Sequence, residues 1–159
     1  MKVIDTIIEG VKVIEPEVHN DQRGFFLETF QTHRYNNLLN LELIFVQDTF
    51  SRSSYNVLRG MHFQQNKPQG KLIQVVRGKI FDVAVDIRKN SSTFGKWFSQ
   101  VLSEENHKQI WIPRGLAHGF QVLSSFADVE YKFDEYYFPE DERCLIWNDL
   151  EVNIDWPLS

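Results

Sequence analysis

The stretch KLIQVVRGKIFDVAVDI, residues 71–87, indicates a β-protein, because it reads as two strands joined by a turn at 77–79. In its second half, large apolar side chains occupy every second position, which is the pattern of a strand with two distinct faces. They are Phe81, Val83, Val85 and Ile87. The opposite face carries Ile80, Asp82, Ala84 and Asp86. If that face points into a barrel, its carboxylates lie in a cavity; in the alternative they face solvent.

Similar short strand-like segments recur on both sides of this stretch, with turn residues between them. They are GFFLETF (24–30), KWFSQVL (96–102), QIWIP (109–113), HGFQVL (118–123) and DVEYKF (128–133). Strands at such regular spacing predict a β-sandwich or a small barrel. Only residues 31–40, QTHRYNNLLN, suggest a helix, and a short one. We therefore expect an all-β fold with one or two short helices.

The composition limits the class of protein. The 159 residues are 42% hydrophobic, which predicts one globular domain over residues 1–159. A net charge of −5 argues against a general nucleic-acid surface but leaves room for a local basic pocket. The single Cys144 excludes an internal disulfide and fits a reducing cytosol. No apolar run approaches the roughly 20 residues of a membrane helix, and residues 1–10 do not resemble a signal peptide. We expect a cytoplasmic protein without a membrane partner.

The stretch NVLRGMHFQ, residues 56–64, places Arg59 and His62 among apolar and small residues. A half-buried strand tolerates such side chains only when a structural partner or a ligand pairs with them. A second histidine, His118, lies in IPRGLAHGF, residues 112–120. A metal site on the first strand would favour another imidazole two positions after His62, but Gln64 stands there, and an amide is a poor ligand. We therefore expect no metal.

These motifs resemble those of the dTDP-4-dehydrorhamnose 3,5-epimerase family, a metal-free branch of the cupins. The similar segments follow one another from about residue 20 to 148: DQRGFFLETF (21–30), VLRGMHFQ (57–64), residues 69–97, residues 102–124 and YKFDEYYFPEDE (131–142). The resemblance implies a cupin-like jelly-roll β-barrel in a homodimer whose N-terminal region reaches into the partner's site. It also implies a nucleotide-linked 4-keto-6-deoxy sugar as substrate and no cofactor. The route would be dTDP-L-rhamnose synthesis for cell-surface polysaccharide.

The implied chemistry explains the residue types. The protons on C3 and C5 of the sugar are acidic because both carbons flank the C4 ketone. A base removes a proton, an enolate forms, and an acid returns a proton to the opposite face. By resemblance, His62 is the base, Tyr131 is the proton donor, Lys71 and Arg59 are cations of the site, and His118 is a second pocket histidine.

The inward-face alternative for residues 80–87 adds Asp82 as a supporting partner of His118. At the nucleotide end, the resemblance implies contacts from the partner's N-terminal segment and from this chain's own pocket. These residues are Arg23, Phe26 (or its neighbour Phe25) and Glu28 from the segment, and Gln47, Thr49, Tyr137 and Glu142 from the pocket. Tyr137 would stack on the base, and Arg23 would hold the pyrophosphate, because its planar fork can donate two hydrogen bonds.

Two departures from the family pattern bear on activity. Family members often carry asparagine where this chain has Thr49, so nucleotide contacts differ. They usually continue beyond the I-x-W-P segment, residues 154–157, and that extension carries an aspartate said to orient the catalytic histidine. This sequence ends at Ser159. We expect either that another group orients His62, or that the activity is altered to one carbon or to another nucleotide sugar.

Three competing interpretations remain open at this point. The chain could be a 4-keto sugar 3,4-ketoisomerase on a similar barrel, although LRGMHFQ and YKFDEYY favour the epimerase. It could be a sugar-nucleotide-binding cupin without catalysis. A metal-dependent cupin oxygenase is disfavoured by Gln64.

Overall fold

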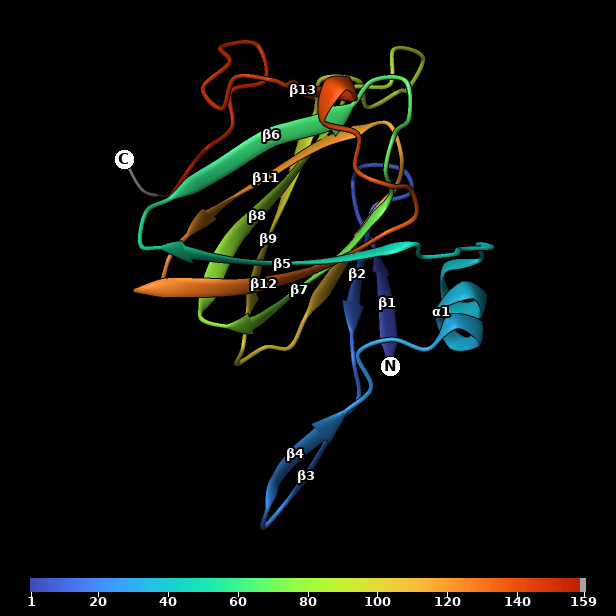
Figure 1. Cartoon of the computed structure of the whole chain (residues 1–159), viewed down its shortest axis with the longest axis vertical. Helices are drawn as coiled ribbons and strands as arrows, with labels where there is room; N and C mark the ends of the chain where they lie inside the picture. The colour runs from blue at the N-terminus through green and yellow to red at the C-terminus, as the bar shows by residue number, and fades with distance from the viewer. Residues whose placement is uncertain (158–159) are drawn as a thin grey trace.

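Residues 71–87 form two consecutive strands, β7 (Lys71–Arg77) and β8 (Lys79–Asp86), as the alternation predicts. Gly78 joins them at a φ of +81°, and a Cβ there would lie 2.2 Å from the carbonyl oxygen of Phe126. Only glycine fits this turn without strain. In the computed structural model the two strands enter different sheets, so this turn is a corner of the barrel (Figure 1). The structure describes residues 1–157, and the last two residues of the predicted domain lie outside the described part.

Six antiparallel strands form the first sheet, in the order β1-β2-β10-β7-β12-β5. Besides β7, its members are β1 (Lys2–Asp5), β2 (Lys12–Glu15), β10 (Gln109–Ile112), β12 (Phe126–Phe133) and β5 (Gln47–Ser54).

Five antiparallel strands form the second sheet, in the order β13-β6-β11-β8-β9. Besides β8, its members are β13 (Glu142–Cys144), β6 (Leu58–Gln64), β11 (Leu116–Val122) and β9 (Trp97–Ser103). The two sheets face each other, and buried apolar side chains from both fill the space between them. Ile73, Val129, Ile80 and Phe120 belong to this core.

The two faces of β8 are both buried, but against different partners. Ile80 and Ala84 lie in the core between the sheets, so the face that also carries Asp82 and Asp86 points inward. Val83 and Val85 pack on the outer side of the five-stranded sheet, beneath a C-terminal segment that includes Ile154. The inward alternative for the carboxylate face is therefore the correct one.

One α-helix, α1 (Thr32–Leu39), covers part of the outer face of the six-stranded sheet. The Gln31 side chain accepts a hydrogen bond from the Arg34 N–H at the start of the helix, and Asn40 ends it in the left-handed conformation. Tyr35 and Leu39, four residues apart, face the sheet. The sequence predicted this helix at residues 31–40. A 3-10 helix, η1 (Pro139–Asp141), precedes β13.

A separate hairpin of β3 (Val18–Asp21) and β4 (Gly24–Leu27) projects away from the barrel (Figure 1). Its two phenylalanines, Phe25 and Phe26, are 58% and 73% exposed, which is unusual for large apolar side chains that have no function outside the core. The jelly-roll class predicted from the sequence is confirmed by these two antiparallel sheets. Within residues 1–157, no helix has the length and apolar character needed to cross a membrane.

Candidate active site

A cavity of about 360 Å³ lies between the two sheets and collects most of the predicted site residues. Its lining comes from β5, β6, β7, β11, β12 and β13, and from the segments before β7 and after β12. Nine predicted residues line it: Gln47, Thr49, Arg59, His62, Lys71, His118, Tyr131, Tyr137 and Glu142. The sequence positions of these residues are spread over about 100 positions, and the sheets bring them together.

The two histidines are cross-strand neighbours. His62 on β6 is directly opposite His118 on β11, so both side chains project from the same face of the five-stranded sheet. β6 and β11 approach closely at this point, because Gly119 lies against the backbone of Gly60 and a Cβ there would be only 3.0 Å from the Gly60 Cα. The glycines thus allow the pair of strands to hold both imidazoles at the cavity.

His62 is half-buried, and burial lowers the pKa of its imidazole below the ordinary value. Lys71, His118 and Arg59 lower that pKa further, whereas Glu142 opposes them. The Glu142 Oε1 atom lies 3.1 Å from His62 Nδ1, although the angle lies outside hydrogen-bond geometry. We therefore describe this contact as electrostatic. At neutral pH the His62 imidazole is neutral and can accept a proton.

His118 is held from behind by Asp82. The Asp82 Oδ2 atom lies 2.7 Å from His118 Nε2, and both side chains are almost completely buried. The structure thus contains the pairing that the inward-face argument predicted. Asp86, on the same face of β8, does not reach the cavity; its carboxylate accepts hydrogen bonds from Arg88, Ser91 and Thr93 in the turn that follows β8.

Two cationic side chains enter the cavity from different strands. Lys71, at the start of β7, is buried, and burial lowers the pKa of its ammonium group to about 8, with Asp82 and Glu142 opposing the shift. Arg59 on β6 is held in place by the hydroxyl of Ser53, which accepts a hydrogen bond from Nε at 2.7 Å. A developing negative charge in the cavity would meet both cations.

Tyr131 faces the histidines from the opposite sheet. It lies on β12, its ring makes an edge contact with His118 at 6.3 Å between centroids, and it stacks on Phe133. Burial raises the pKa of the phenol well above its ordinary value, with a smaller opposing effect of Ser51. Tyr131 therefore keeps its proton at neutral pH and can donate it.

The rim of the cavity is formed by Tyr137, whose hydroxyl donates a hydrogen bond to Glu142 Oε2 at 2.7 Å. Its backbone N–H donates to Gln47 Oε1 at 2.9 Å, and the Gln47 amide also donates to Thr49. Glu142 thus contacts the rim tyrosine through one carboxylate oxygen and His62 through the other.

Four predicted residues do not line this cavity, and one of them is Asp82, which contacts His118 instead. Arg23 and Phe26 lie on the projecting hairpin, where Arg23 pairs with Asp21, and Glu28 pairs with Arg34 of α1. In a single chain the hairpin therefore contributes nothing to the cavity. A second chain would have to bring these residues there, as the resemblance implies.

The sequence reasoning missed several lining residues. They are Ser51, Phe63, Gln64, Gln69, Phe120 and Phe133; Gln64 had been considered only as a metal ligand. A signal for Ser51 was present: β5 carries Gln47, Thr49, Ser51 and Ser53 at every second position, opposite the inward residues of β12. Because the other face of β5 is polar as well, except for Phe50, the alternation did not reveal which face is inside.

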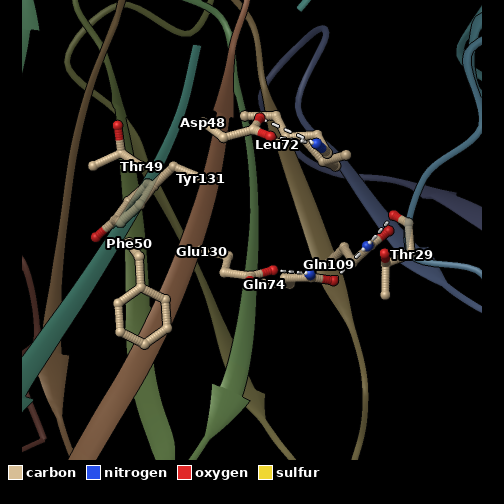
Figure 2. Close-up of a pocket in the computed structure, with 10 residues that line it drawn as sticks. Thr29, Asp48, Thr49, Phe50, Leu72, Gln74, Gln109, Glu130 and Tyr131 are labelled. Carbon is tan, nitrogen blue, oxygen red and sulfur yellow. Dashed lines mark hydrogen bonds and ion pairs between the residues drawn. The ribbon is translucent and has the colours of Figure 1, made fainter.

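A second cavity, of about 200 Å³, lies against the six-stranded sheet and includes outward-facing residues of β12 (Figure 2). Its polar groups satisfy one another: Asp48 pairs with Lys132, and Gln74 donates a hydrogen bond to Glu130. No histidine belongs to its lining among the described residues. The first cavity, with its unpaired imidazole nitrogen and buried cation, is therefore the better candidate for chemistry.

A metal centre is not indicated by the donor set. Within residues 1–157, no three histidine, cysteine or carboxylate side chains lie close enough together to hold a metal ion. What the cavity offers instead is a neutral imidazole on one sheet, a protonated phenol on the facing sheet, the buried cation Lys71 and the more exposed cation Arg59. This arrangement can move a proton onto and off a carbon whose neighbouring carbonyl oxygen accepts negative charge.

Comparison with known proteins agrees with this chemistry. The family model described as dTDP-4-dehydrorhamnose 3,5-epimerase matches residues 5–159. The enzyme of that name from Escherichia coli K12 is 51% identical over 158 residues, covering 99% of this chain and 85% of the relative. A 3,5-epimerase from Legionella pneumophila, solved with dTDP-4-keto-L-rhamnose, has a TM-score of 0.97 at 52% identity and covers 99% and 84% of the two chains. The Bacillus anthracis epimerase, solved with TDP and PPi, has a TM-score of 0.96 at 44% identity and covers 99% and 91%.

Proposed function

Because this chain belongs to the dTDP-4-dehydrorhamnose 3,5-epimerase family, we propose how its residues perform the reaction of that family. The chain is an isomerase that epimerises a nucleotide-linked 4-keto-6-deoxy sugar. The whole of residues 1–159 acts as one domain. The observation that carries the proposal is that His62 and Tyr131 lie on facing sheets, so a sugar ring between them has the base on one face and the proton donor on the other.

His62 removes the protons from C3 and C5 in two separate events, between which His62 releases its proton to solvent and Tyr131 regains one. The C4 ketone accepts the electron pair, and the C–H bond breaks as the enolate forms, so the substrate itself supplies the electron sink. The lowered pKa keeps the imidazole neutral and ready to accept, and the Glu142 carboxylate beside it stabilises the imidazolium that results. Asp82 holds His118 at the same end of the cavity, where His118 contacts the sugar.

Lys71 and Arg59 stabilise the enolate oxygen and the adjacent phosphate charge. Lys71 is buried, so its attraction for an oxyanion is weakly screened by solvent. Tyr131 returns a proton from the opposite face, which inverts the carbon. The raised pKa of the phenol fits a donor and not a resident phenolate.

The nucleotide end of the site is completed by a second copy of the chain. Tyr137 stacks on the base, while Gln47, Thr49 and Glu142 line the same rim. We propose a homodimer in which the exposed Arg23 and Phe26 of one hairpin, together with Glu28, enter the partner's site.

A mixing experiment tests the homodimer. We expect the His62→Ala chain and the Arg23→Ala/Phe26→Ala chain each to be inactive or weakly active alone. When the two variants are mixed and exchange subunits, a dimer with one chain of each kind forms. In that dimer the intact hairpin of the His62→Ala chain enters the site of the other chain, which has an intact His62, so activity returns. If subunit exchange is demonstrated and the mixture stays inactive, the hairpin of one chain does not complete the partner's site.

The localisation is proposed from chemistry alone. A nucleotide-linked sugar is an intracellular metabolite, and the single Cys144 fits a reducing compartment, so the cytoplasm is the expected site of action. The product would supply dTDP-L-rhamnose for cell-surface polysaccharide.

The roles of His62 and Tyr131 are tested by measuring proton removal, as deuterium incorporation, separately from inversion of the carbon. Tyr131→Phe removes one oxygen; we expect deuterium from heavy water still to enter the substrate while the inverted product falls by about 100-fold, in the range of one lost general acid. Tyr136→Phe removes the same atom from an exposed neighbour and should leave both rates unchanged. Inversion at the wild-type rate in Tyr131→Phe would remove Tyr131 from the mechanism.

A further inference from the structure

Gln64 ends β6 on the wall of the cavity, two residues after His62, and its side chain is only 5% exposed. Burying an amide is costly unless its donors and acceptor are paired. The partners of Gln64 therefore indicate what it does.

Both N–H groups of the Gln64 amide are already used within the chain. Nε2 donates to the carbonyl of Lys67 at 2.7 Å and to the carbonyl of Tyr136 at 3.1 Å, and Oε1 accepts from the Phe138 N–H at 2.8 Å. An amide has two N–H donors, so none is left for a substrate. Gln64 lines the cavity but is not available to donate a hydrogen bond to a bound sugar.

These bonds hold the backbone on both sides of Tyr137. Gln64 binds Tyr136 and Phe138, and Gln47 Oε1 accepts from the intervening Tyr137 N–H at 2.9 Å. The segment thus has three consecutive residues fixed by two glutamines from different sheets. The Tyr137 ring itself is 47% exposed, so packing does little to hold it.

We propose that Gln64 is a positioning residue for nucleotide recognition: it fixes the Tyr136–Phe138 backbone so that the Tyr137 ring is preorganised to stack on the nucleotide base. The proposal rests on the function proposed above, in which Tyr137 contacts the base. A preformed aromatic surface binds more tightly than a mobile one, because binding then does not have to order the segment. A cupin metal site would favour a histidine two positions after His62. In this chain Gln64 occupies that position and orders the backbone at the rim of the cavity.

Titration of the full-length protein with dTDP tests the proposal, with inorganic pyrophosphate as the probe that lacks a base. Gln64→Met keeps the length of the side chain and removes all three hydrogen bonds. We expect the Kd for dTDP to rise about tenfold, within the range that one base-stacking contact supplies, and the Kd for pyrophosphate to stay within about twofold. In a Gln64→Met/Tyr137→Ala double variant, the Kd for dTDP should match that of Tyr137→Ala within about twofold, because the two side chains act through one contact.

A matched control separates positioning from loss of stability. Gln121→Met replaces another buried glutamine, which donates to Asn56 Oδ1 at 2.7 Å and does not line the cavity. It should lower the melting temperature without changing either Kd. If Gln64→Met folds poorly, Gln64→Glu is the second variant. It keeps an oxygen that can accept from the Phe138 N–H, but it places a carboxylate oxygen against the carbonyls of Lys67 and Tyr136. We expect the same changes in the Kd for dTDP and the Kd for pyrophosphate.

The outcomes are distinct. A wild-type Kd for dTDP in Gln64→Met, alongside a raised one in Tyr137→Ala, would overturn the inference and leave the role of Tyr137 intact. An equal loss of pyrophosphate affinity, or additive losses in the double variant, would also overturn it. An unchanged Kd in Tyr137→Ala would refute the proposed role of Tyr137, and the inference with it, while proton exchange by the wild type would still report on the epimerase reaction.

Discussion

Glu142→Gln removes the negative charge beside His62 while it keeps the size of the side chain. The amide oxygen of the new glutamine can still accept the hydrogen bond that the Tyr137 hydroxyl gives to Glu142. The substitution therefore isolates the electrostatic effect of the carboxylate on the base.

The distance sets the magnitude. Unit charges 3.1 Å apart, as between Glu142 Oε1 and His62 Nδ1, attract by about 1–3 kcal/mol at the high effective dielectric of a solvent-accessible site. The high dielectric is appropriate because the two side chains are 45% and 34% exposed. Since 1.36 kcal/mol corresponds to one pKa unit, removal of the charge should lower the His62 pKa by about one unit. This change adds to the lowering that burial already causes.

The pH profile of kcat/KM for dTDP-4-keto-6-deoxyglucose is the assay. A base of lower pKa stays deprotonated to lower pH, so the acid limb of the profile should move down by about one unit. The plateau should fall by about three- to tenfold, because the weaker base removes carbon-bound protons more slowly. At low pH, the lower pKa of His62 raises kcat/KM, whereas the weaker basicity of His62 lowers it. A shifted acid limb together with a lower plateau therefore distinguishes loss of the Glu142 charge from a general loss of activity.

Glu130→Gln is the matched control, because Glu130 lies on the other face of the six-stranded sheet and contacts Gln74 (Figure 2). It should leave the profile unchanged. An acid limb that does not move in Glu142→Gln would refute the idea that Glu142 acts on His62.

Three further predictions follow from the site and the fold. Lys71, with a pKa of about 8 in the free protein, should lose its proton and its activity as the pH rises through that value. Lys71→Arg stays protonated, so the alkaline limb of kcat/KM should move upward, and an unmoved limb would exclude Lys71 as its origin. Asp82→Asn should lower kcat by about tenfold or more through a misplaced His118, and a wild-type initial rate would show that this pair has no part in function. Gly78→Ala should lower the free energy of unfolding in a urea titration by about 2 kcal/mol or more, because of its positive φ and the nearby Phe126 carbonyl; a smaller loss would show that the corner relaxes.

The fold could be predicted from local patterns. The alternation in residues 80–87 identified β8, and the stretch 31–40, QTHRYNNLLN, identified α1. Each pattern depends only on neighbours in the chain, so a single sequence is enough to reveal it.

The contacts that tune the site could not be predicted in the same way. Glu142 reaches His62 because β13 pairs with β6, and no local pattern predicts that pairing. The inward serines of β5, Ser51 and Ser53, were missed because the outer face of that strand is also polar except for Phe50, so the alternation did not show which face is inside. Gln64 was considered only as a poor metal ligand, whereas two of its three partners lie on a segment more than 70 positions further along the chain.

The projecting hairpin shows a second limit on predicting the site from the sequence. Phe26 is exposed in the single chain, and Arg23 pairs only with a neighbour in its own turn. The place of these residues in a site depends on a second chain, which neither the alternation of residues nor one folded copy supplies.

Proton NMR of dTDP-4-keto-6-deoxyglucose in heavy water tests the central claim most directly, with wild-type protein and with His62→Ala. The account predicts that the wild type replaces the protons on both C3 and C5 with deuterium, and that His62→Ala replaces neither at a comparable rate. Exchange at C3 alone would restrict the chemistry to one carbon. Exchange at both carbons by His62→Ala at the wild-type rate would contradict the assignment of His62 as the base.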